Sequence, residues 1–124
     1  MSKSKGNAED IIKQYESSGQ IMYQATLDGD YRSNNREGER LTKIFKLFEQ
    51  DYQLANECIP VLLKSKNVVI RTKAAAYCFA LKINTEYAEK VLEEIIADPQ
   101  NGIFGFNAKM LLQVWRENGE IAIY

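Results

Sequence analysis

Asn67-Val-Val-Ile-Arg-Thr-Lys-Ala-Ala-Ala-Tyr-Cys-Phe-Ala-Leu-Lys-Ile83 and the segment that follows it, Asn84-Thr-Glu-Tyr-Ala-Glu-Lys-Val-Leu-Glu-Glu-Ile-Ile-Ala97, decide the fold class of this 124-residue chain. They predict two helices joined by a very short turn. The first is apolar around nearly its whole circumference, which is typical of a helix buried between others. The second has apolar residues at i, i+3, i+4, i+7 and i+8 and charged residues elsewhere, which indicates a one-sided amphipathic helix. The pair therefore predicts an all-α protein with an alanine-rich central helix.

On either side of residues 67–97, the same periodicity predicts helices in most of the remaining chain. Asn7 is expected to cap a first helix that Ser17-Ser-Gly19 interrupts, and a short helix follows over 21–27. One long helix is expected over 31–52 and another over 53–63, where Pro60 predicts either a kink or a late start. The last helix opens near 104–106 and ends before Gly119, which suits the position after a helix C-terminus.

Length and composition predict one domain. Residues 1–6 are expected to be a disordered tail, 7–119 a single helical domain and 120–124 a C-terminal tail. The longest apolar run falls far short of the ~20 residues of a membrane helix, and no signal peptide is recognised after the first methionine. Cys58 and Cys78 lie in apolar helical contexts and are interpreted as small buried hydrophobic residues. A cytoplasmic location is expected.

The chain contains no histidine, which removes the commonest general base and most zinc sites. Its carboxylates fall in turns or on the polar faces of amphipathic helices, where they are not held in a shielded pair. No catalytic residue, no metal ligand and no cofactor is therefore predicted. We expect a protein that is not an enzyme.

The opening of the long helix is polar almost throughout. Such a segment is either a solvated face or a recognition surface, and the candidate binding residues on it are Tyr31, Arg32, Asn35 and Arg36.

Charge is distributed unevenly after residue 58. Five basic residues and no acid lie between Cys58 and Thr85, whereas five acids and one base lie between Glu86 and Asp98. The two groups either neutralise each other between adjacent helices or leave a basic ridge that meets an acidic partner. The candidate binding residues of that ridge are Lys64, Lys66 and Arg71. Asn107 either orients the last helix or faces the same polar surface as Asn35.

Four short motifs carry a family resemblance. They are Ile70-Arg71-x-x-Ala74-Ala75, Tyr31-Arg32-x-x-Asn35-Arg36, Ala88-x-x-x-Leu92-x-x-Ile95 and Phe106-Asn107-Ala108-Lys109-x-x-Leu112-x-x-Trp115. The first resembles a HEAT repeat, and their order resembles a small bacterial family catalogued as a domain of unknown function. The resemblance implies a right-handed α-α superhelix (HEAT/armadillo-like) of about six or seven helices. Immunity proteins of bacterial toxin systems offer an analogy for its function.

These observations favour a non-enzymatic protein–protein interaction domain, of adaptor or immunity type, whose partner is another protein. The alternative is a nucleic-acid-binding HEAT-like module. The formal net charge of −1 and the single tryptophan, which is expected in the core, disfavour that alternative. The sequence leaves the oligomeric state open.

Overall fold

The structure, a computed structural model, describes the backbone of residues 3–124 and the side chains from Asn7 onward. The chain is all-α, with helices α1 (Lys3–Asp28), α2 (Tyr31–Gln50), α3 (Tyr52–Leu62), α4 (Val68–Leu81), α5 (Thr85–Ala97) and α6 (Ile103–Asn118), and a short 3-10 helix η1 (Pro99–Asn101). No strand occurs within residues 3–124. The predicted fold class and number of helices are confirmed.

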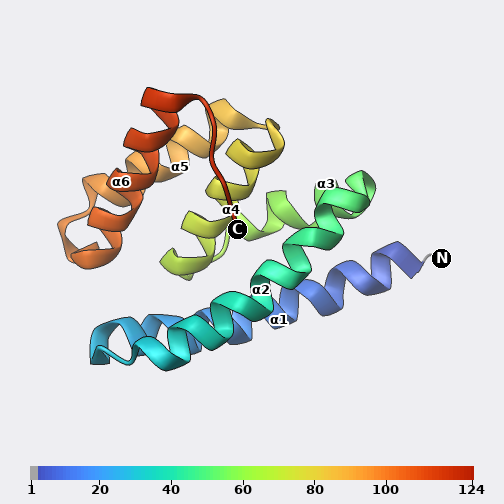
Figure 1. Cartoon of the computed structure of the whole chain (residues 1–124), viewed down its shortest axis with the longest axis horizontal. Coiled ribbons are helices and arrows are strands. Elements are labelled where there is room, and N and C mark those ends of the chain that lie inside the picture. The colour runs from blue at the N-terminus through green and yellow to red at the C-terminus, as the bar shows by residue number, and fades with distance from the viewer. Residues whose placement is uncertain (1–2) are drawn as a thin grey trace.

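Helix α4 is the centre of the molecule, as its all-round apolarity predicts. It contacts α1, α3, α5 and α6. Ile70, Ala74, Ala75, Cys78 and Phe79 are fully buried along it. Figure 1 shows α1 and α2 as a long antiparallel pair on one side of α4 and the α5–α6 pair on the other. The segment after α6 returns across α4 toward α2, so the predicted C-terminal tail packs back onto the helices.

The predicted interruption at Ser17-Ser-Gly19 is wrong, because α1 continues unbroken to Asp28. Two tertiary contacts use these helix-weakening residues. The Ser18 hydroxyl is buried and donates a hydrogen bond to Glu37 of α2 at 2.7 Å. Gly19 lets α4 approach closely, since a Cβ at this position would lie 2.5 Å from Ile70 Cγ1.

Helix boundaries elsewhere differ from prediction by a few residues. Helix α1 begins at Lys3, so Asn7 does not cap it. Met1 and Ser2, which belong to the tail expected to be disordered, lie outside the described residues. Asp51 ends α2 and caps α3 by accepting a hydrogen bond from the Leu54 N–H, so Tyr52 belongs to α3. Helix α3 does not start late, and Pro60 lies in its last turn. Only the Asn56 carbonyl loses its helical donor there, because proline has no N–H.

An aromatic cluster joins the first helices to α4. Tyr15 and Tyr77 are buried and their hydroxyl oxygens lie 2.8 Å apart. The Tyr77 ring also packs against Phe45 and Phe48 of α2. Trp115, expected in the core, is only partly buried: it stacks on Phe79 with ring centroids 4.5 Å apart. Its indole N–H donates to Glu89 at 3.1 Å.

Candidate functional site

The predicted binding residues lie at four places on the molecule. Tyr31, Arg32 and Arg36 are exposed at the start of α2, and Lys64 is exposed in the loop before α4. Asn35 and Asn107 line one groove, and Lys66 and Arg71 line a hollow elsewhere. Helix α1 contacts α2 through Ser18 and the α3–α4 loop through Glu16, so the candidate residues of α2 and those of the loop lie on different sides of α1.

Two pockets that share Lys73 lie beside α2 and α4, and together they are called here the α2–α4 groove. Its first part has a volume of about 490 Å³ and is lined by Asn35, Gly38, Glu39, Thr42, Lys43, Lys46, Lys73 and Tyr124. Its second part, of about 230 Å³, is lined by Met22, Thr26, Asn34, Val69, Thr72, Lys73, Phe104 and Asn107. Lys73 of α4 lines both parts. Asn35 lines the first part and Asn107 the second, so the two amides lie in neighbouring pockets that share Lys73.

Lys73 is the unusual residue of this groove. Burial alone lowers the pKa of its ammonium group, because removal from water disfavours the charged form. No carboxylate lies within salt-bridge distance of Lys73 among the described residues. Lys43 and Lys46 add two more ammonium groups, and Glu39 is the only acidic side chain among the described residues that line the groove. The groove is therefore net positive and has a desolvated charge at its centre.

Hydrogen bonding further defines what the groove can bind. The Thr42 and Thr72 hydroxyls donate to backbone carbonyls of their own helices, at 2.9 Å each, so they have no proton left for a ligand. The remaining donors include the three lysines and the side-chain amides of Asn34, Asn35 and Asn107. This set is suited to oxygen acceptors, above all carboxylates.

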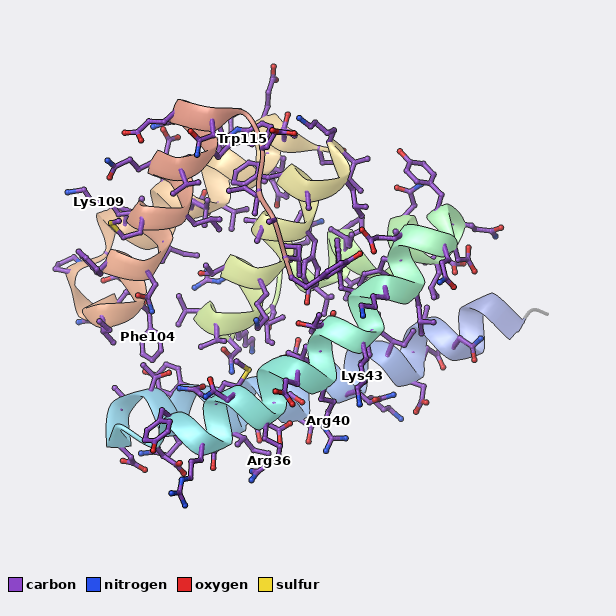
Figure 2. The ribbon with its side chains drawn as sticks, in the orientation of Figure 1. Arg36, Arg40, Lys43, Phe104, Lys109 and Trp115 are labelled. Carbon is purple, nitrogen blue, oxygen red and sulfur yellow. The ribbon has the colours of Figure 1, made fainter. Side chains whose placement is uncertain are left out.

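The hollow around Arg71 lies between α1, the start of α4 and η1. It has a volume of about 410 Å³ and is lined by Glu16, Gln20, Tyr23, Lys66, Asn67, Val68, Arg71 and Asn101. Tyr23 stacks on Phe104 with ring centroids 4.5 Å apart. Because Tyr23 lines the hollow and Phe104 lines the α2–α4 groove, this stack lies between the two. Figure 2 shows Phe104 reaching from the start of α6 toward the α1–α2 pair.

The exposed basic row on α2 consists of Arg32, Arg36, Arg40 and Lys43 at i, i+4, i+8 and i+11. Arg36 and Arg40 both pair with Glu37, at 3.3 and 3.2 Å, and Figure 2 shows these two arginines pointing away from α4. The hydrogen bond from Ser18 and then those two arginines hold the pKa of Glu37 below its ordinary value. Arg36 therefore has a structural role beside any role in binding.

Mutual neutralisation, one of the two alternatives for the basic residues before Thr85 and the acids of 86–98, is not seen in the ion pairs of the described residues. Glu89 and Glu93 of α5 pair instead with Arg116 of α6, at 2.9 Å each. No ion pair joins either glutamate to Lys64, Lys66, Arg71 or Lys73 within the described part of the chain. The basic residues before and along α4 consequently keep their charge available.

Sequence reasoning missed an apolar face on α6. Ile103, Phe106, Met110 and Val114 are 48, 57, 43 and 38 % exposed. Their spacing of i, i+3, i+7 and i+11 places them on one side of α6, away from the buried Phe104, Ala108 and Leu112. A second helical stripe was the signal that could have revealed this face. Exposed apolar surface of this kind is characteristic of protein interaction sites.

Three further features are the two cysteine thiols, the arrangement of potential metal ligands and the apolarity of the helices. Burial raises the pKa of the Cys58 thiol to about 11 and of the Cys78 thiol to about 12, which leaves both as poor nucleophiles at neutral pH. No cluster of three or more metal-binding side chains is present among the described residues. Within the same residues, no helix combines the length and apolarity needed to cross a bilayer.

Comparison of the chain with protein-family models, with curated proteins and with solved structures finds no match. The function is therefore inferred from the surfaces described above.

Proposed function

We propose that this protein is a non-enzymatic protein–protein interaction domain that binds an acidic segment of its partner in the α2–α4 groove. The observation that carries the proposal is Lys73, a desolvated ammonium group without a carboxylate partner among the described residues. The adaptor or immunity-type role and the HEAT-like superhelix implied by the family resemblance are part of the same proposal.

The physical reason is the cost of an unpaired buried charge. Removing a cation from water is unfavourable unless an anion compensates it, and the attraction between the two is stronger where water is excluded. An incoming carboxylate would supply this compensation to Lys73. Lys43 and Lys46, on the neighbouring turns of α2, would attract further acids along an extended segment.

The α6 face favours a protein partner over a duplex nucleic acid, because the phosphate backbone gains nothing from aliphatic side chains such as Ile103, Met110 and Val114. The nucleic-acid alternative has one observation in its support, the basic row on α2. Two of its four members are already engaged by Glu37, which weakens the row as a phosphate-binding surface. A nucleic acid is retained as a competing outcome of the experiment.

The test measures binding of a fluorescent peptide of alternating glutamate and glycine by anisotropy. A peptide of alternating lysine and glycine is the matched control, and labelled single-stranded and duplex DNA test the alternative. We expect saturable binding of the acidic peptide that Lys73→Met weakens about tenfold or more, which corresponds to about 1.4 kcal/mol. Lys90→Gln, at an exposed lysine of α5, should leave affinity unchanged.

Lys73→Met should remain folded, because it replaces a partly buried, unpaired charge with an apolar side chain of similar length. Equal affinity of wild type and Lys73→Met for the acidic peptide would overturn the groove as its binding site. Tighter binding of DNA, falling by orders of magnitude between about 50 and 200 mM salt, would instead support the nucleic-acid module.

A further inference from the structure

The geometry points to a second binding site: the hollow formed by α1, the start of α4 and η1 binds a single oxyanion group, carboxylate or phosphate, between Arg71 and Lys66. This site is separate from the α2–α4 groove and does not rest on the function proposed for it.

Arg71 is the central residue of the hollow. Its Nε is buried and has no hydrogen-bond partner, although a guanidinium group normally uses its donors when water is excluded. No carboxylate lies within salt-bridge distance of Arg71 among the described residues. The guanidinium is thus partly desolvated and uncompensated, and its planar fork matches the geometry of a carboxylate or phosphate.

The acidic side chain that lines the hollow already accepts a hydrogen bond within the protein. Glu16 is the only carboxylate that lines the hollow, and it accepts a hydrogen bond from the Ser65 hydroxyl at 3.0 Å. Lys66 is exposed at the rim and has no ion-pair partner among the described residues. The lining therefore carries two positive charges against one occupied negative charge, which favours an anion in the space between them.

The walls of the hollow are held in place by other contacts. The Asn67 side chain caps α4 by accepting from the Val69 and Ile70 N–H groups, at 2.8 and 3.4 Å. The Asn101 amide donates to the Ile95 carbonyl at 2.8 Å. The Tyr23 ring is fixed by its stack on Phe104. A site whose walls are already ordered loses little conformational entropy on binding. Its volume of about 410 Å³ falls in the range of small-molecule pockets.

The test follows the arginine Nε–H resonances of ¹⁵N-labelled protein by NMR, because the Arg71 guanidinium lines the proposed site. Inorganic phosphate and acetate are titrated in separate series at constant ionic strength with chloride. We expect a saturable shift of the Arg71 resonance, assigned by its loss in Arg71→Lys. The Arg116 resonance should not follow it, since this guanidinium is already held by Glu89 and Glu93.

Two matched variants locate the site. Lys66→Gln should weaken the affinity about two- to fivefold, as expected for one exposed charge, whereas Lys64→Gln, at an exposed lysine two residues away, should not. Saturation by phosphate alone identifies a phosphate site, and saturation by acetate alone identifies a carboxylate site.

Two outcomes would overturn the inference. One is an Arg71 resonance that moves no more than that of Arg116 up to about 20 mM anion. The other is a change in the affinity of the hollow for phosphate or acetate in Lys73→Met protein, which would make the hollow part of the α2–α4 groove. The anion titration itself is carried out on wild-type protein, and the variants serve to assign the resonance and to locate the site. Failure of the acidic peptide to bind the groove would leave this test unaffected.

Discussion

Gly19 and Gly38 both lie inside long helices, but tertiary structure gives them opposite roles. A Cβ at Gly19 would meet Ile70 Cγ1 at 2.5 Å, whereas a Cβ at Gly38 would meet only the flexible end of Met22 at 4.0 Å. We expect Gly19→Ala to destabilise the protein by about 1 to 3 kcal/mol through overpacking. Gly38→Ala should stabilise it by about 0.5 to 1 kcal/mol through helix propensity. Urea unfolding of both variants checks the pair, and shifts of the same sign would contradict it.

Glu37 is a buried carboxylate, only 4 % exposed, that links α2 to Ser18 of α1. Its pKa is lowered by the Ser18 hydrogen bond and by the two neighbouring arginines. The stability that ionised Glu37 provides is therefore fully present above the ordinary glutamate pKa of 4.5. It is lost as the pH falls through the lowered pKa of Glu37.

We expect Glu37→Gln to cost about 1 to 3 kcal/mol at neutral pH, because charged hydrogen bonds to a buried group are lost. The variant should also lose less stability than wild type on acidification. Denaturant unfolding at neutral pH and at about pH 3 measures both effects. Glu39→Gln, at the exposed glutamate two residues away, is the control; an equal acid response in wild type and Glu37→Gln would exclude this role.

Among the elements, α1 and α4 are joined by the Tyr15–Tyr77 hydroxyl pair. Burial raises the pKa of Tyr77 to about 12 and raises that of Tyr15 further still. The stability due to these neutral phenols is fully present below pH 10 and is lost as the pH rises through the raised values. We expect wild type to unfold at alkaline pH together with cooperative ionisation of the two tyrosines, measured by tyrosine absorbance. Ionisation of every tyrosine near pH 10 in folded protein would contradict this prediction.

Loss of the Tyr15 hydroxyl should also be measurable at neutral pH. We expect Tyr15→Phe to lower the free energy of unfolding by about 1 kcal/mol, because a buried hydrogen bond is lost.

Helices α1 and α6 meet through the Tyr23–Phe104 stack. Phe104 is buried, so Phe104→Ala should lower the free energy of unfolding by about 3 to 5 kcal/mol. Tyr23 is 39 % exposed, so Tyr23→Ala should lower it by less. A double-mutant cycle with Tyr23→Ala should give a coupling of about 0.5 to 1.5 kcal/mol, as found for aromatic pairs. A coupling of zero would mean that the stack does not hold α6 against α1.

At the scale of the whole molecule, α4 contacts both the α1–α3 and the α5–α6 parts of the chain. We therefore expect one cooperative unfolding transition. Trp115, the only tryptophan, lies on α6 and reports locally by fluorescence, whereas far-UV circular dichroism reports on all helices. Their denaturation midpoints should coincide. A lower midpoint by fluorescence would show that the α5–α6 pair unfolds separately.

Local sequence chemistry was sufficient for much of the fold. The spacing of Ile70 to Leu81 and the five apolar positions of α5 predicted both helices, because helical periodicity survives whatever packs against it. Gly119, in the left-handed conformation after α6, was predicted for the same local reason. Asn67 caps α4 with its own side chain. These features depend on neighbours within a few residues along the chain.

Other features of the molecule depend on contacts between residues that are far apart in the sequence. Ser18 and Gly19 have the helix-breaking signature of a turn, yet Glu37 and Ile70 make them part of an unbroken helix. The candidate binding residues were recognised by type, but their grouping was not, because it requires the path of α1 between them. Lys73 was one of several basic residues in the sequence. Its role at the centre of the groove arises from burial without a partner, which packing alone determines.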